Sequence, residues 1–195
     1  MAVHRITPDS ALLLICDVQE RFRTAIFQMD HVIATTATLA RGAEEFGMPI
    51  VVTEQNPKAL GKTVGEVPLG KQARVFAKEK FSMCTSEVET HFRHLNRSQV
   101  LICGVETHVC VQQTALDLLT QGYQVFIVTD GVSSQRALDR SAALSLLQAS
   151  GARLTSMESV FFELMRGKDC PQFKLISGLI KDAGKLPSEA RLSSL

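Results

Sequence analysis

Short, unbroken apolar runs alternate along the chain with longer segments whose apolar residues recur at helical spacing. An apolar run of about four to eight residues, rich in β-branched side chains, is typical of a strand covered on both faces of a sheet. The pattern predicts strands at residues 11–16, 50–53, 74–77, 100–103, 124–128 and 152–155. The amphipathic segments between them predict helices at residues 31–46, 86–95, 107–121, 135–150 and 171–181.

Glycine and proline mark several of these boundaries. Gly122 closes the helix that starts near Thr107, Pro49 opens the second strand, and Gly104 is expected to end the fourth. Residues 129–131, Thr-Asp-Gly, are expected to end the next strand. The stretch 54–70 contains glycine and proline and is long enough to be a functional loop.

Strands that alternate with helices indicate a parallel sheet with helices on both faces, an α/β fold of three αβα layers. The 195 residues, 45% of them hydrophobic and 21% charged, are enough to bury a sizeable core. No internal repeat or linker divides them. We expect one domain, residues 1–195, with a polar tail from about residue 184.

Charge and cysteine content narrow the function classes. The 21 basic and 20 acidic residues give a net charge of +1 and are spread along the chain, so neither nucleic acid nor an anionic membrane is an expected partner. The first apolar run, 11–16, is far shorter than the roughly 20 residues that span a bilayer. Five cysteines, an odd number, indicate a reducing compartment.

These features predict a cytoplasmic protein. The last residues, Ser193-Ser194-Leu195, are a weak variant of the peroxisomal Ser-Lys-Leu address and leave a peroxisome-type organelle as the alternative.

Three reactive side chains follow predicted strands. Asp17 follows the run 11–16, Lys78 follows 74–77, and Cys110 lies one turn past the strand 100–103. In a parallel sheet these positions meet at the carboxyl edge, where such folds build their sites. A thiol in the first turn of a helix is shifted toward thiolate by the helix dipole. A carboxylate, an ammonium and a thiol together can form a nucleophilic site.

Each of these residues also has a purely structural interpretation. An aspartate after a strand is often a turn former or a helix cap. Lys80 lies two residues after Lys78, and either of them could be a solvated surface lysine. A lone cysteine such as Cys110 is more often core packing than a nucleophile. The presence of all three residues at one sheet edge supports a catalytic site more strongly than any one of them alone.

Four neighbours are candidates for lining a pocket. Gln19 and Phe22 lie near Asp17, Phe81 lies near Lys78, and Thr114 lies one turn past Cys110, although core packing explains the two phenylalanines equally well. His108 is two residues from Cys110 and points to another helical face, so a capping or surface role is expected. Gly61-Lys62-Thr63 lacks the earlier glycine of a phosphate-binding loop.

Four short motifs, in order, carry a family resemblance: residues 16–19 (CDVQ), 78–82 (KEKFS), 104–110 (GVETHVC) and 130–134 (DGVSS). The chain resembles the cysteine-containing branch of the isochorismatase-like hydrolases, close to the isochorismatase domain-containing proteins. The resemblance implies a six-stranded parallel sheet and a catalytic triad of Asp17, Lys78 and Cys110. It also implies a non-proline cis peptide before Glu106, which would direct backbone N–H groups into the pocket, and Glu106 and Thr107 are expected to bind substrate.

Departures from the family pattern reduce the number of reactions that we expect this chain to catalyse. Enzymes of this fold that cleave isochorismate lack the cysteine, so Cys110 argues against that substrate. Nicotinamidases of the family have an Asp-x-His metal site after the second strand, where this chain has Thr53-Glu54-Gln55. We therefore expect no metal and no cofactor. The remaining prediction is hydrolysis of an amide, a ureide or a related C–N bond of a small molecule through a covalent intermediate on Cys110.

A second hypothesis is a catalytically idle protein that keeps the fold and acts through protein interactions. A thiol-exchange protein is not supported, because the sequence has no C-x-x-C pair. A homo-oligomer, dimer or tetramer, is expected from fold analogy and from the apolar face of residues 109–119.

Overall fold

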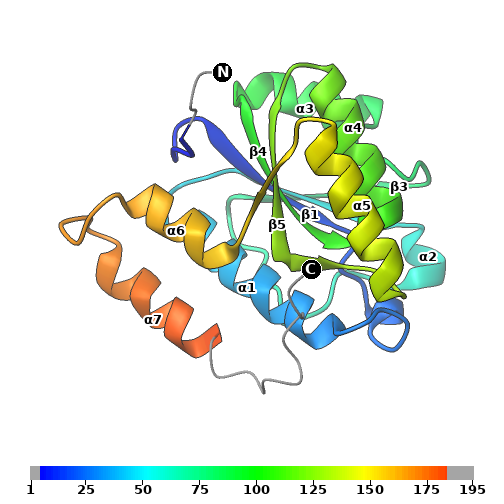
Figure 1. The fold of residues 1–195 in the computed structure, drawn as a ribbon, viewed down its shortest axis with the longest axis horizontal. Helices are drawn as coiled ribbons and strands as arrows, with labels where there is room; N and C mark the ends of the chain where they lie inside the picture. Colours follow the sequence, from blue (N-terminus) through cyan, green and yellow to red (C-terminus); the bar gives the residue numbers. More distant parts are fainter. Residues whose placement is uncertain (1–4, 184–195) are drawn as a thin grey trace.

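A single six-stranded parallel sheet runs through the protein, seen in a computed structural model that describes residues 5–183 (Figure 1). The strand order is β3-β2-β1-β4-β5-β6, which confirms the predicted α/β class. The strands are β1 (Ala11–Cys16), β2 (Ile50–Gln55), β3 (Ala73–Lys78), β4 (Gln99–Val105), β5 (Gln124–Ser133) and β6 (Arg153–Thr155). The C-terminal tripeptide considered as an organelle address lies outside the described residues.

Helices cover both faces of the sheet (Figure 1). One layer consists of α1 (Met29–Glu45), α6 (Met157–Met165) and α7 (Phe173–Ala183). The other consists of α3 (Ser86–Leu95), α4 (Gln112–Thr120) and α5 (Ala137–Ala149). Two short elements, η1 (Glu20–Phe22) and α2 (Pro57–Leu60), lie in the connections that follow β1 and β2. Within residues 5–183, no helix has both the length and the apolar character that a membrane crossing requires.

Strand β1 shows why an unbroken apolar run predicts a central strand. Leu13 and Ile15 point into the core beneath α1 and α6, and Leu12, Leu14 and Cys16 point into the core beneath α3, α4 and α5. Successive side chains of a strand alternate between faces, so both faces are buried only if every position is apolar.

Four predicted strands end too early: β2 and β3 continue to Gln55 and Lys78, and the two larger differences are in β4 and β5. Strand β4 does not stop at Gly104 but continues to Val105, and β5 passes through residues 129–131 to Ser133. The pairing register shifts between Ile102 and Gly104, so the two strands pair again beyond an irregularity. The buried Arg140 guanidinium donates to the backbone carbonyls of Thr129, at 2.6 Å, and Val132, at 3.0 Å. These hydrogen bonds satisfy carbonyl groups that regular pairing between strands would otherwise have satisfied.

Helix α6 was not predicted. The Ser156 side chain accepts a hydrogen bond from the Ser159 N–H and so caps its first turn. Met157, Val160, Phe161 and Leu164 follow at helical spacing and are buried. The capping and spacing signals are both present in the sequence.

Gly42 of α1 packs against Phe161 of α6. A Cβ atom at this position would collide with the ring of Phe161, which is 1% exposed and cannot swing into solvent. We therefore expect Gly42→Ala to lower the free energy of unfolding by about 1–3 kcal/mol, the usual cost of overpacking. Urea unfolding at neutral pH measures this change.

Gly178 in α7 is the matched control. It is exposed, and a Cβ atom there would meet nothing within 4 Å. Gly178→Ala should leave stability unchanged or raise it by up to about 1 kcal/mol, because alanine is the better helix former. Equal effects at the two sites would show that the α1–α6 contact is not tight.

Candidate active site

Asp17 and Lys78 form a buried ion pair at the carboxyl edge of the sheet. Asp17 directly follows β1, and Lys78 is the last residue of β3, with β2 between the two strands. The Lys78 Nζ atom lies 2.7 Å from Asp17 Oδ2, and both side chains are fully buried. Thr53 of β2 donates its hydroxyl to the other carboxylate oxygen, Oδ1, at 2.7 Å.

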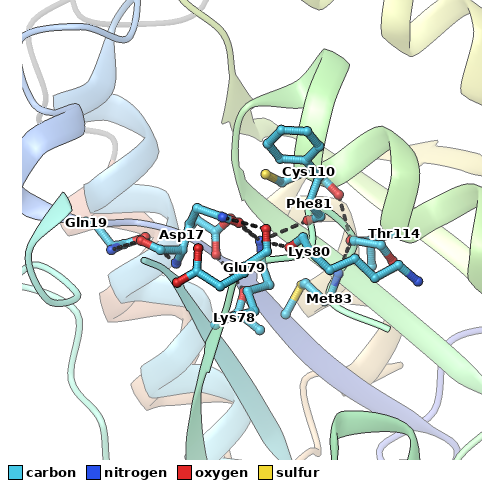
Figure 2. Close-up of polar contacts among 12 residues, drawn as sticks. Asp17, Gln19, Lys78, Glu79, Lys80, Phe81, Met83, Cys110 and Thr114 are labelled. Atoms are coloured by element: carbon cyan, nitrogen blue, oxygen red, sulfur yellow. Dashed lines mark hydrogen bonds and ion pairs between the residues drawn. The ribbon is translucent and has the colours of Figure 1, made fainter. Parts of the chain in front are cut away.

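The Lys78 ammonium has three further oxygen neighbours (Figure 2). They are Gln55 Oε1 at 2.7 Å and the backbone carbonyls of Phe81 at 2.8 Å and Lys80 at 3.1 Å. Burial alone would lower the pKa of Lys78, but the nearby acidic groups Cys16, Asp17 and Cys110 outweigh it and raise this pKa above its ordinary value. The ammonium is therefore charged at neutral pH.

Cys110 lies in a π-helical turn, Thr107–Val111, between β4 and α4. A non-proline cis peptide joins Val105 to Glu106 just before this turn, as the family resemblance implies. Cys110 is 7% exposed. Its thiol lies close enough to Lys78 and Cys16 to raise the pKa of both groups.

Cys16 is the second thiol at this edge. Burial, reinforced by its Cys110 and Asp17 neighbours, raises the pKa of Cys16 well above its ordinary value, so this thiol stays protonated. The structure thus brings Asp17, Lys78 and Cys110 together, whereas Lys80 lies outside the group. The Lys80 side chain is 53% exposed and pairs with Asp117 at 3.1 Å. That the three residues are catalytic stays a prediction.

Two of the predicted pocket residues use their polar atoms within the protein. Gln19 donates Nε2 to the carbonyls of Gln55, at 3.0 Å, and Gly61, at 2.6 Å, and its Oε1 accepts the Gln55 N–H at 2.7 Å. Thr114 donates to the Cys110 carbonyl at 2.6 Å and accepts the Met83 N–H at 2.8 Å. Both side chains therefore brace the backbone around the site.

The other predicted pocket residues differ in their surroundings. Phe22 is partly buried and packs against the core beneath α1, whereas Phe81 is 52% exposed. The buried Thr107 hydroxyl has no hydrogen-bond partner in the described part of the chain. The Glu106 carboxylate accepts the Gln135 N–H at 2.8 Å. Substrate contacts of these residues stay predictions.

A cavity of about 150 Å³ opens beside the turn that carries Cys110. Its lining residues are Glu106, His108, Gln135, Arg136 and Asp139. The His108 Nδ1 atom lies 2.9 Å from Ser134 Oγ, so this side chain ties the turn to the end of β5.

Sequence reasoning missed Thr53 and Gln55, whose side chains fix the ion pair. Both lie on β2, where Thr53 was predicted only as a strand residue and Gln55 only as part of a functional loop without metal ligands, and no motif marks them. Among residues 5–183, no group of three or more His, Cys, Asp or Glu side chains gathers as a metal site.

Comparison with known proteins places this geometry in a family. A family model for the isochorismatase domain matches residues 11–159. The secreted isochorismatase effector Isc1 of Phytophthora sojae is 46% identical over 184 residues, which cover 91% of this chain and 88% of that protein. Isochorismatase domain-containing protein 1 of Danio rerio is 44% identical over 177 residues, which cover 90% of this chain but only 62% of the relative.

Solved structures agree with the sequence relatives. The MAR1 ribonuclease of Caenorhabditis elegans has a TM-score of 0.88 at 38% identity and covers 98% of this chain and 100% of its own. YcaC of Pseudomonas aeruginosa, solved with hexane-2,5-diol and covalent acrylamide, has a TM-score of 0.82 at 26% identity and covers 95% of this chain and 100% of its own. YcaC of Escherichia coli, described as an octameric hydrolase of unknown specificity, has a TM-score of 0.86 at 23% identity, covering 95% of this chain and 96% of its own. With the domain match over most of its length, the chain belongs to the isochorismatase family.

Proposed function

We propose that this protein is a cysteine hydrolase that cleaves an amide, a ureide or a related C–N bond of a small molecule. The observation that carries the proposal is the fully buried Asp17–Lys78 pair at 2.7 Å beside the Cys110 thiol. Strongly interacting titratable groups gathered at one sheet edge are characteristic of catalytic sites.

The proposed reaction assigns one task to each residue. Asp17 accepts the Cys110 proton, and the sulfur attacks the carbonyl carbon of the substrate. Backbone N–H groups of the turn near Cys110 stabilise the oxyanion. The C–N bond then breaks, and the leaving amine takes the proton from Asp17. Water, deprotonated by Asp17, hydrolyses the thioester, which releases the acid and restores the thiol.

Lys78 keeps the charge balanced during these steps. Its ammonium contacts the Asp17 carboxylate before proton transfer and is near enough to Cys110 to stabilise the thiolate afterwards. The P. aeruginosa YcaC relative carries covalent acrylamide, an electrophile that modifies thiolates, and this supports a reactive nucleophile in proteins of this kind.

Two other activities are the alternatives. The first is a protein that acts through protein contacts alone, and the P. sojae relative is described as a secreted effector. The C. elegans relative is described as a ribonuclease, which makes RNA hydrolysis a second candidate reaction. The net charge of +1 does not favour binding of a polyanion. An intact triad is unnecessary for a scaffold, and this favours the enzyme.

Alkylation of the five cysteines separates an enzyme from a scaffold. We expect acrylamide to modify Cys110 at pH 7 at least about tenfold faster than the partly exposed Cys170, because thiolates are the nucleophiles. Burial raises the pKa of Cys84 to about 11 and of Cys103 to about 12, so these thiols should stay unmodified. Peptide mass spectrometry over a time course gives all five rates in one sample, and a Cys110 rate no higher than that of Cys170 would rule out the thiolate mechanism.

Substitution of the triad tests the assigned roles against a panel of small amides, ureides and a short RNA. Cys110→Ser should remove nearly all turnover while the fold is kept, because serine is nearly isosteric but far less acidic. Asp17→Asn cannot accept the thiol proton and should lower turnover by roughly two to four orders of magnitude.

The two lysines provide the matched control. Lys78→Met should slow Cys110 alkylation at neutral pH, with recovery as the pH rises, because the stabilising charge is gone. Lys80→Met should have little effect, since exposed ion pairs contribute little. The lysine has been placed wrongly if Lys80→Met is the damaging change, and the mechanism is wrong if Cys110→Ser retains full activity on a confirmed substrate.

We also propose that the protein is a homo-oligomer, as the octameric E. coli relative suggests. The apolar face of residues 109–119 is not available for a second subunit, because Val111, Ala115 and Leu118 are fully buried in the core. Helix α5 offers a better surface. Leu138 is 78% exposed and Leu146 43% exposed, and residues 141–149 include no charged side chain.

Light scattering at micromolar concentration tests this surface. Wild type should give a mass that is a multiple of 21.4 kDa. Leu138→Glu should shift the mass toward the monomer by burying a charge in the interface, while the helix tolerates glutamate in its first turn. Leu175→Glu, on α7 and 44% exposed, is the control and should leave the mass unchanged. A monomeric wild type would exclude the oligomer.

A further inference from the structure

The ends of β1, β2 and β3 are joined by a closed ring of hydrogen bonds that passes through Gln55. Asp17 contacts Lys78, Lys78 contacts the Gln55 side chain, and the Gln55 backbone is held by Gln19. The Gln19 N–H donates to the Asp17 carbonyl at 2.9 Å, which closes the ring. Gln55 is therefore tied to both partners of the ion pair.

The orientation of the Gln55 amide is fixed at both ends. Its Nε2 donates to the Glu79 carbonyl at 2.9 Å, and its Oε1 accepts from Lys78 at 2.7 Å. The reversed amide would set an NH₂ group against the ammonium and an oxygen against a carbonyl, so only the observed orientation satisfies both neighbours.

The position of the Lys78 ammonium depends on the Gln55 contact, because several oxygen atoms compete for the ammonium protons. An ammonium has three N–H donors, and Lys78 has four oxygen neighbours. Besides Asp17 and Gln55, the remaining acceptors are the carbonyls of Lys80 and Phe81, which are adjacent in one loop. Without Gln55, both remaining neutral acceptors would draw Nζ toward that loop.

We infer that Gln55 is a positioning residue, which holds the Lys78 ammonium between Asp17 and Cys110 and so sets the reactivity of the thiol. This inference rests on the proposed function of Cys110 as the nucleophile. Gln55 supplies a strong acceptor without a charge. The Asp17–Lys78 pair therefore stays electrically balanced, and the ammonium can still stabilise a thiolate.

The pH dependence of Cys110 alkylation tests this role without any knowledge of the substrate. The variants are Gln55→Met, which keeps the side-chain length and removes the acceptor, and Gln55→Glu, which keeps the acceptor and adds a negative charge. Gln113→Met is the matched control, because Gln113 is exposed on α4. Lys78→Met gives the effect of losing the ammonium itself. Each alkylation rate is measured by mass spectrometry from pH 5 to pH 10, with a melting curve for each variant.

Gln55→Met should slow alkylation at pH 7 by about tenfold, the scale of one hydrogen bond to a charged group, and the difference should shrink as the pH rises. Gln55→Glu should move the half-maximal pH upward by about one unit, because a second carboxylate beside Lys78 opposes a nearby thiolate. Gln113→Met should match wild type. A purely structural role for Gln55 would lower the melting temperature without moving the half-maximal pH.

The outcomes separate the two proposals. If Lys78→Met slows Cys110 alkylation while Gln55→Met and Gln55→Glu both follow the wild-type pH profile, the positioning role of Gln55 is excluded. The proposal that Cys110 is the nucleophile is then unaffected. If wild-type Cys110 reacts no faster than Cys170, both the role of Cys110 as nucleophile and the positioning role of Gln55 are excluded. Should Gln55→Met fail to fold, the shift expected for Gln55→Glu decides the question alone.

Discussion

The burial of the Asp17–Lys78 pair is the constraint on which the candidate site depends. Removing two charges from water costs several kcal/mol for each ion, and their attraction offsets this only with good geometry and further hydrogen bonds. Here the carboxylate receives the Thr53 hydroxyl, and the ammonium has three neutral oxygen neighbours besides Asp17. Because these partners come from the ends of β1, β2 and β3, the register of three strands must be kept for the pair to remain stable.

The strand order explains why the turn that carries Cys110 lies beside this pair. The sequence of connections reverses between β1 and β4, and in open parallel sheets such a switch point forms a crevice at the carboxyl ends of the strands. Asp17 leaves β1 on one side, and the Cys110 turn leaves β4 on the other. Gly104 makes this approach possible: its φ is +115°, and a Cβ atom there would collide with the Cys16 carbonyl.

Local signals predicted most of the scaffold, while the details of the site depend on distant partners. The run Ala11–Cys16 and the helix Ser86–Leu95 were predicted with the observed bounds. Gly104 was misread as a strand end because glycine usually interrupts a strand, whereas here it permits close contact with β1. Gln55 gave no signal, because its role comes from Lys78 and Gln19, which are 23 and 36 residues away.

Charge balance gives a reason for keeping an ion pair where an apolar pair would be easier to bury. Before reaction, the Asp17 carboxylate and the Lys78 ammonium cancel, and the Cys16 thiol stays protonated because burial and its neighbours raise its pKa. In the proposed mechanism the proton moves from Cys110 to Asp17, so the ammonium exchanges a carboxylate partner for a thiolate partner. The net charge of the buried site is the same before and after this step. A lone buried thiolate would bear a large desolvation cost, and a lysine that remains charged throughout offsets it.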